Sequence, residues 1–246
     1  MHLNLLVITC FTMKIEEKVE LLYNAYKDKK EIEPFEVNSE EATQIFNLFT
    51  QKLVKDEGLG GYKISLVTLE TIKKFKANGP DYGILTNNMI VKKGNEVKLP
   101  FRYSYAEIEV IVLADNCKED NIPHCIKETY LGIEMPMTRF NAPLNKLNFN
   151  QLKADDMVAG LLYLGEKVSE QPKSVEVYIN DELKGKDKPN FIYGNYLEML
   201  KWLIKSIGKE VSGYVSTGSI VGPIPINKGE KIRVKSDNAE FEVKLY

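Results

Sequence analysis

Tyr105-Ala106-Glu107-Ile108-Glu109-Val110-Ile111-Val112-Leu113 has the alternation of a β-strand. Successive side chains of a strand point to opposite faces, so Glu107 and Glu109 share one face with Ile111 and with aromatic residues. The opposite face is aliphatic, which predicts a strand covered on both sides. Adjacent carboxylates in such surroundings are costly unless a partner neutralises them. We therefore expect either a lysine or arginine, or a divalent metal ion, beside this pair.

The composition predicts a globular chain with a sizeable core. It has 246 residues, of which 43% are hydrophobic and 28% are charged. Such a chain can form one large domain, or a small domain beside a larger one. The formal net charge is −2 and long basic stretches are missing, which disfavours nucleic acid and anionic membranes as partners.

The three cysteines, Cys10, Cys117 and Cys125, are an odd number without a CxxC pair. This pattern disfavours a disulfide framework or a zinc knuckle, so we expect reduced thiols in a cytoplasmic protein; a Cys117–Cys125 bridge would need a secreted context. The apolar residues 1–12 are too short to cross a membrane and lack the features of a signal peptide. They are either an over-long start or a strand packed on the body.

The remaining chain divides into a helical N-terminal unit, residues 13–60, and a β-rich catalytic domain, residues 61–246. Apolar residues at helical spacing predict one helix over 13–30 and a second one after an Asn38 cap. Strands are predicted at 62–68, 83–86, 89–91, 102–114, 131–140, 158–164, 175–180, 214–217, 232–235 and 240–245. Helices are predicted at 69–77, 123–129 and 196–207. Many strands with few crossover helices favour a mixed, mostly antiparallel β-body.

Histidine is nearly absent, because His2 lies in the apolar leader and His124 stands beside Cys125. A Ser-His-Asp triad or a histidine-rich zinc site is therefore disfavoured. Neighbouring residues on a helix point about 100° apart, so His124 and Cys125 are better interpreted as structural than as a nucleophilic pair. A metal bound by this chain would have oxygen ligands, which favours Mg²⁺ or Mn²⁺.

Further polar residues stand inside apolar runs. Glu134 lies in the middle of one such run, and Pro136 predicts an edge or a bulge nearby. Lys63 lies in another run and must be paired or functional; it could simply neutralise one of the glutamates. Asp81 after Pro80 is equally open, since this pattern is common in turns.

The order of six short motifs resembles one family, the 2-keto-4-pentenoate hydratases and 4-oxalocrotonate decarboxylases of the fumarylacetoacetate hydrolase superfamily. The motifs are Gly61-Tyr62-Lys63-Ile64, Pro80-Asp81-Tyr82-Gly83, Ala106-Glu107-Ile108-Glu109, Gly132-Ile133-Glu134, Ala154-Asp155-Asp156-Met157-Val158-Ala159-Gly160 and Thr217-Gly218-Ser219. The resemblance runs from about Val19 to the C-terminus. It implies an α+β fold, a β-rich mixed roll of the fumarylacetoacetate hydrolase C-terminal type, preceded by a small helical unit.

The resemblance also implies roles for individual residues. Glu107, Glu109 and Glu134 match the Mg²⁺ or Mn²⁺ ligands. Lys63 and Asp81 match catalytic positions, and Thr217 and Ser219 match a substrate-contacting turn. The chain departs from the family at Ser65-Leu66-Val67-Thr68 and near Met137, although Arg139 is kept. These departures concern the substrate pocket.

The expected activity is that of a metal-dependent hydro-lyase, which adds water to a 2-hydroxy-2,4-dienoate in aromatic meta-cleavage catabolism and gives a 4-hydroxy-2-ketoacid. Three alternatives stay open: a 4-oxalocrotonate-type decarboxylase, an acylpyruvate C–C hydrolase, and a non-catalytic ketoacid-binding relative. The expected partner is a small 2-ketoacid or dienoate. The resemblance also implies a homo-oligomer.

Overall fold

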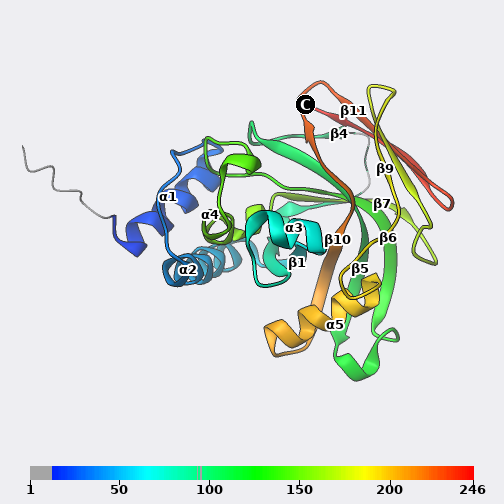
Figure 1. The fold of residues 1–246 in the computed structure, drawn as a ribbon, viewed down its shortest axis with the longest axis horizontal. Coiled ribbons are helices and arrows are strands. Elements are labelled where there is room, and N and C mark those ends of the chain that lie inside the picture. Colours follow the sequence, from blue (N-terminus) through cyan, green and yellow to red (C-terminus); the bar gives the residue numbers. More distant parts are fainter. Residues whose placement is uncertain (1–12, 93, 95) are drawn as a thin grey trace, which may run out of the picture.

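The computed structural model describes residues 13–92, 94 and 96–246, and its strands form two sheets (Figure 1). The seven-stranded sheet has the order β2 (Asp81–Thr86), β1 (Leu59–Ser65), β10 (Val211–Ile226), β5 (Ser104–Cys117), β6 (Ile126–Met135), β7 (Leu161–Lys167) and β3 (Ile90–Val91). The five-stranded sheet has the order β4 (Glu96–Val97), β12 (Glu240–Leu245), β11 (Lys231–Ser236), β8 (Val175–Ile179) and β9 (Glu182–Asp187).

Most neighbouring strands are antiparallel, and the pairs β1/β10, β3/β7 and β4/β12 are parallel. The helices are α1 (Ile15–Asp28), α2 (Ser39–Glu57), α3 (Leu69–Phe75), α4 (Phe149–Ala154) and α5 (Tyr196–Ile207). Short 3₁₀ turns lie at Asn87–Met89, Glu119–Asn121, Leu144–Lys146 and Asp156–Val158. The predicted α+β, β-rich, mostly antiparallel fold is confirmed.

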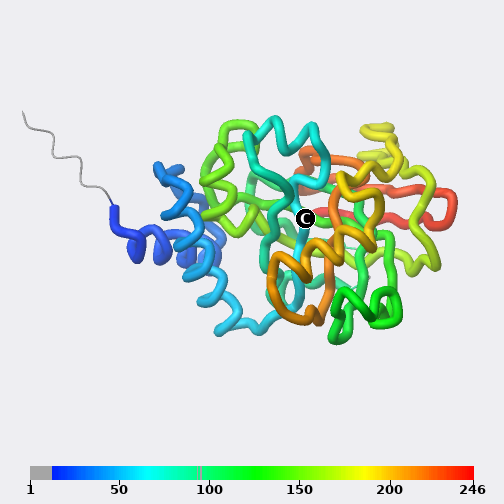
Figure 2. Tube along the Cα trace, turned by 60° about the horizontal axis from the view of Figure 1, so that its bottom comes forward, coloured from blue at the N-terminus to red at the C-terminus, as the bar shows by residue number. Residues whose placement is uncertain are grey.

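The N-terminal helices lie at the end of the molecule opposite the smaller sheet (Figures 1 and 2). Helix α2 begins where Asn38 accepts a hydrogen bond from the backbone of Glu41, and it ends at Gly58, whose φ is +75°. The Asn38 cap is the one that the sequence predicts. No helix within the described residues is long and apolar enough to cross a membrane.

Two hydrophobic clusters cover the two faces of β5. Ile108, Val110 and Val112 belong to the cluster that also contains the inner residues of the smaller sheet and of α5. Ile111 belongs to the second cluster, which contains the apolar faces of α1 and α2. Because Glu107 and Glu109 alternate with the first set, they point toward the side of the N-terminal helices. The prediction that both faces of this strand are covered is confirmed.

Three sequence predictions need correction or extension. Residues 123–129 are not a helix: residues 122–125 form a turn, and β6 begins at Ile126, where alternating Ile126, Glu128 and Tyr130 follow a strand period. Cys117 and Cys125 are joined by a disulfide across this β5–β6 hairpin, so the expectation of reduced thiols is wrong for this pair. Strands β4 and β9 and helix α4 were not predicted. Cys10, His2 and the rest of the apolar leader lie outside the described residues.

Candidate metal centre

Three carboxylates meet on one face of the larger sheet. Glu107 and Glu109 lie two residues apart on β5, and Glu134 pairs directly with Glu107 across the β5–β6 ladder. One oxygen from each carboxylate lies within 4.8 Å of the others. Glu109 and Glu134 are fully buried, and Glu107 is partly exposed. Strand alternation places Glu107 and Glu109 on one face, as predicted, and the β5–β6 pairing brings Glu134 beside them.

Lys63 extends from β1 into this cluster. Its Nζ atom donates a hydrogen bond to Oε2 of Glu134 at 2.8 Å, and its side chain is 2% exposed. Burial disfavours the charged ammonium, but the pKa of Lys63 is nevertheless raised, because the charges of Glu134, Glu107 and Glu109 surround it. The lysine therefore stays protonated and neutralises part of the cluster.

One ammonium does not balance three carboxylates. If all four groups ionise, the cluster has a formal charge of −2 in a buried place. Burial, together with the charge of Glu107, raises the pKa of Glu109 to about 8. Burial also raises the pKa of Glu134 well above its ordinary value, even though Lys63 lowers it. A divalent cation would neutralise this excess charge and displace the protons.

The donor atoms of the cluster fit such an ion. All three ligand side chains offer oxygen, the donor that Mg²⁺, Mn²⁺ and Ca²⁺ prefer. Oε1 of Glu134 is buried and has no hydrogen-bond partner among the described residues. A buried carboxylate oxygen without a partner is costly, and coordination to a cation would satisfy it. We therefore regard Glu107, Glu109 and Glu134 as the residues that would hold a divalent metal.

Strand β10 fixes the orientation of Glu109. The hydroxyl of Ser216 donates to Oε2 of Glu109 at 2.5 Å, and the backbone N–H of Gly218 donates to the same oxygen at 2.7 Å. The β5–β10 register shifts between Ser216 and Ser219, which is a β-bulge that releases the Gly218 N–H from the ladder. The resemblance implied a substrate-contacting turn at Thr217 and Ser219, whereas strand β10 continues through both residues. The sequence offered no sign that this segment would hold Glu109.

The two residues predicted to contact substrate differ in their surroundings. Thr217 is fully buried, and its hydroxyl donates to the backbone carbonyl of Val110 at 2.7 Å. The hydroxyl of Ser219, which is aligned with Glu109 in the ladder, has no partner among the described residues. Ser219 therefore has a free hydroxyl near the acid cluster, whereas the hydroxyl of Thr217 is already used within the strand pair.

Asp156 is a buried acid beside Lys63, and the sequence did not identify it as a site residue. Its Oδ1 accepts the Ile84 N–H at 2.8 Å, and its Oδ2 is without a partner in the described part of the chain. A Cβ built on Gly83 would lie 3.1 Å from Cγ of Lys63 and 3.3 Å from Oδ1 of Asp156. The carboxylate thus takes the space above Gly83, the ladder partner of Lys63. Burial raises the pKa of Asp156 to about 7.

The backbone that carries Asp156 is strained. Asp156, Met157 and Val158 have φ values of 54°, 48° and 54°, a region that side-chain-bearing residues rarely occupy. The neighbouring Asp155 anchors this segment, because its carboxylate accepts Nε of buried Arg139 at 2.5 Å and the backbone N–H of Arg139 at 3.0 Å. The Asp155-Asp156 pair in the sequence was the one signal for this arrangement.

Asp81, the other predicted catalytic acid, opens β2 and pairs with Ser65 in the ladder. Its Oδ1 accepts the Lys153 ammonium at 2.7 Å. Lys153 in turn lies 3.8 Å from the ring centroid of Phe46. Asp81 is on the same strand face as Gly83 and is less buried than Asp156. Its carboxylate is therefore bound to a cation of its own.

Two of the residues that depart from the family have structural contacts. Val67 is buried, and a Cβ on Gly218 would lie 2.3 Å from its Cγ1 atom, so Val67 supports the β10 bulge. Thr68 is the N-cap of α3, where its hydroxyl accepts the Thr71 N–H at 3.2 Å.

His124 lies exposed in the turn of the β5–β6 hairpin, at the end distant from the three glutamates in the β5–β6 register.

Comparisons with known proteins identify the fold. No protein-family description matches the sequence, and a search of curated proteins also finds no match. Among solved structures, the chain is similar to 4-oxalocrotonate decarboxylase from Pseudomonas putida G7, complexed with magnesium and adipate. That similarity has a TM-score of 0.79 at 17% identity and covers 96% of this chain and 99% of the other.

Similarities over a smaller share of the chain extend to other solved enzymes. Fumarylpyruvate hydrolase from Pseudomonas aeruginosa, in complex with Mn²⁺ and pyruvate, matches with a TM-score of 0.56 at 15% identity over 75% of this chain and 88% of its own. The 2-hydroxyhepta-2,4-diene-1,7-dioate isomerase from Mycobacterium marinum matches with a TM-score of 0.55 at 12% identity over 77% of each chain. The resemblance predicted from the six motifs is thus confirmed at the level of the fold.

Proposed function

We propose that this chain is a divalent-metal-dependent enzyme that acts on a 2-hydroxy-2,4-dienoate, with Glu107, Glu109 and Glu134 as the ligands of Mg²⁺ or Mn²⁺. The observation that carries the proposal is the cluster of three carboxylates with a single buried ammonium and an unpartnered Glu134 oxygen. Solved proteins of the same fold, in complexes with magnesium or Mn²⁺, support it.

The residues around the cluster suit chemistry through an enolate. A bound divalent ion supplies a Lewis acid that stabilises negative charge developing on a ketoacid oxygen. Lys63 has three N–H donors and uses one for Glu134, so another can donate to the same developing oxyanion. The free hydroxyl of Ser219 can orient the substrate carboxylate.

Proton transfer is the remaining requirement, because tautomerisation moves a proton between oxygen and carbon before water adds. We assign this role to Asp81, as the resemblance implies. Its carboxylate forms an ion pair with Lys153 and is the group that we propose as the general base. Water addition to the activated double bond then gives a 4-hydroxy-2-ketoacid.

Incubation of the purified protein with 2-hydroxypenta-2,4-dienoate and Mg²⁺ tests this reaction. We expect the ultraviolet absorbance of the diene to disappear, a hydrated product to form, and EDTA to stop turnover. Asp81→Asn should abolish the proton transfer while leaving metal binding intact. Turnover that persists in EDTA would exclude the proposed metal role.

Decarboxylation is the second candidate, and one observation favours it: the solved structure that matches nearly the whole chain is a 4-oxalocrotonate decarboxylase. The same electron sink would serve loss of CO₂. Release of CO₂ from 2-oxo-hex-enedioate, without hydration of the dienoate, would assign the chain to this reaction.

Two other functions have less support. The first is hydrolysis of an acylpyruvate, which relatives perform with a histidine and a glutamate. Among the described residues no histidine lies beside the acid cluster, since His124 lies in the hairpin turn. Rapid cleavage of acetylpyruvate that is lost in His124→Ala would reverse this ranking. Binding of oxalate or pyruvate without turnover across a panel of 2-ketoacids would instead indicate a non-catalytic relative.

We also propose that the chain forms a homo-oligomer, on the basis of the family resemblance. Light scattering should give a mass that is a multiple of 28.1 kDa. A mass equal to one chain would contradict this.

A further inference from the structure

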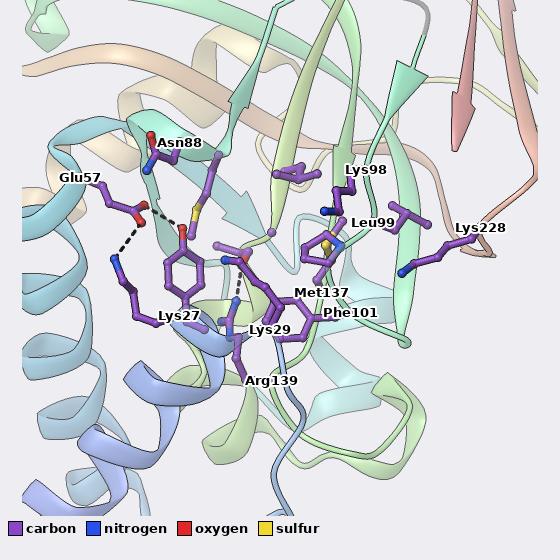
Figure 3. A pocket seen from close by; sticks show the side chains of 16 residues that line it. Lys27, Lys29, Glu57, Asn88, Lys98, Leu99, Phe101, Met137, Arg139 and Lys228 are labelled. Carbon is purple, nitrogen blue, oxygen red and sulfur yellow. Dashed lines mark hydrogen bonds and ion pairs between the residues drawn. The ribbon is translucent and has the colours of Figure 1, made fainter. Parts of the chain in front are cut away.

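Figure 3 shows the lining of a cavity of about 620 Å³. Its walls come from the end of α1, the end of α2, the segment after β4, the segment between β6 and β7, and the β10–β11 turn. Neither Lys63 nor any of the three glutamates lines it. This cavity therefore needs an explanation separate from the proposed metal centre.

The charge of the cavity is strongly biased. The lining contains five cationic residues and one acidic residue, Glu57; the cationic ones are Lys27, Lys29, Lys98, Arg139 and Lys228. Glu57 is already engaged, since its Oε2 accepts the Tyr26 hydroxyl at 2.8 Å and its Oε1 lies 3.8 Å from Nζ of Lys27. The guanidinium of Arg139 is used by Asp155 and by backbone carbonyls.

The other three ammonium groups of the lining form no ion pair with a described residue. Lys29, Lys98 and Lys228 have no carboxylate within ion-pair distance among the described residues. They come from α1, the segment after β4 and the β10–β11 turn, so the fold gathers them from distant parts of the chain. In Figure 3 the amino ends of Lys98 and Lys228 point toward the middle of the cavity, opposite Lys27 and Glu57.

Lys29 is held at this place at a conformational cost. It is the C-cap of α1 with φ 56° and ψ 45°, the left-handed conformation in which glycine is favoured. Its Nζ lies 3.8 Å from the ring centroid of Tyr26 and 5.9 Å from that of Phe101. Burial lowers the pKa of Lys29, and the nearby charges of Arg139 and Lys27 lower it further, although Glu57 opposes them. An anion in the cavity would relieve this repulsion.

The inner wall is apolar. Buried residues line it, namely Met89, Leu99, Phe101 and Met137. A cationic rim above an apolar wall suits a ligand that has a charged end and a hydrocarbon body, because each part then meets a matching surface.

We propose that this cavity binds a small organic anion, a doubly charged oxyanion group on a short apolar or aromatic body, with Lys29, Lys98 and Lys228 as its cationic contacts. The oxyanion is either a phosphate group or a pair of carboxylates. The cavity is a second ligand site and does not depend on the metal.

Calorimetry with two probes tests the proposal and separates the two sources of charge. Phenyl phosphate carries a phosphate on a ring, and phthalate carries two carboxylates on a ring. Phenol is the control for the ring without the charge, and inorganic phosphate is the control for the charge without the ring. We expect one of the two probes to bind saturably in EDTA, more tightly than either control, and more weakly as salt increases.

The variants locate the binding site. The double variant Lys98→Gln/Lys228→Gln should lower the affinity for the probe by at least tenfold. The control is Lys209→Gln, at an exposed lysine outside the cavity, which should leave the affinity unchanged. Lys98 and Lys228 are exposed, so the double variant should melt at the same temperature as the wild type, which would show that its fold is kept. The Glu109→Gln variant should bind the probe as the wild type does.

Several results would overturn the proposal. Absence of saturable binding by both probes would do so, as would equal binding by the double variant. Binding that EDTA or Glu109→Gln removes would place the probe at the acid cluster instead. An oligomer that dissociates in the double variant would assign the lysines to a contact between copies of the chain.

Discussion

The ammonium of Lys63 on β1 lies 2.8 Å from a carboxylate oxygen of Glu134 on β6, although β10 and β5 stand between these two strands. In a flat sheet, three strand spacings would separate the backbones by about 14 Å. The contact therefore requires the sheet to curl toward the face that carries the acids. This curvature concentrates the charged groups in a small buried volume.

Removal of the Lys63 ammonium should destabilise the metal-free protein. In EDTA, Lys63→Met should reduce the free energy of unfolding by about 3–5 kcal/mol, because Glu134 would be left buried without its cation. Urea denaturation measures the change. Lys52→Met, which breaks the more exposed pair with Glu20, should cost less than about 1 kcal/mol. Equal effects of the two variants would show that the buried pair is not needed for stability.

Metal binding should appear in thermal melts. Mn²⁺ at a hundred times its dissociation constant should stabilise the wild type by about 2.7 kcal/mol, which corresponds to roughly 5–10 °C in Tm for a chain of this size. Glu109→Gln should lose most of this shift and all turnover while remaining folded, because the amide has the same shape. Glu16→Gln on the exposed side of α1 is the control. An unchanged wild-type Tm and activity with Mn²⁺ would refute the metal site.

The metal-free protein should become less stable as the pH rises from about 4 to 7. Burial raises the pKa of Asp156 from its ordinary value to about 7, so in this window the folded state binds more protons than the unfolded state. Each additional proton held by the folded state gives a slope of about 1.4 kcal/mol per pH unit. Glu109, with a pKa raised to about 8, acts in the same direction.

Asp156→Asn should make this decline shallower, and denaturation in EDTA at several pH values measures it. The variant keeps an oxygen that can accept the Ile84 N–H, so the local backbone should persist. Parallel curves for variant and wild type would mean that Asp156 titrates normally in the folded protein.

Gly218→Ala should disturb Glu109 through the backbone. Gly218 has φ +116°, and a Cβ there would meet Val67, so we expect a loss of about 1–3 kcal/mol in stability together with weaker Mn²⁺ binding. Gly208→Ala is a matched control, since it has φ +72° but open space around the new methyl group. It should cost about 1–2 kcal/mol, the penalty of an L-residue in the left-handed region, and leave metal affinity unchanged. Unaltered Mn²⁺ binding in Gly218→Ala would show that the Gly218 N–H does not support the metal ligand.

Local patterns predicted much of this molecule. Strand alternation placed Glu107 and Glu109 on one face, and a lone acid in an apolar run identified Glu134. The role of Ser216 was missed because it depends on a register shift between β10 and β5. The position of Asp156 depends on three residues with positive φ, which no hydrophobic period reveals. Segment 123–129 was assigned to the wrong type of structure because its few apolar residues fit both periods.

The bulge in β10 also bears on how this site could change over time. Because the donor to Glu109 at Gly218 is a main-chain group, replacements of the neighbouring side chains at 217 and 219 cannot delete it. Under the proposed function, Ser219 can therefore vary with the substrate while the main-chain support of Glu109 stays constant. Such a separation would let one scaffold diversify its specificity without rebuilding its reactive centre.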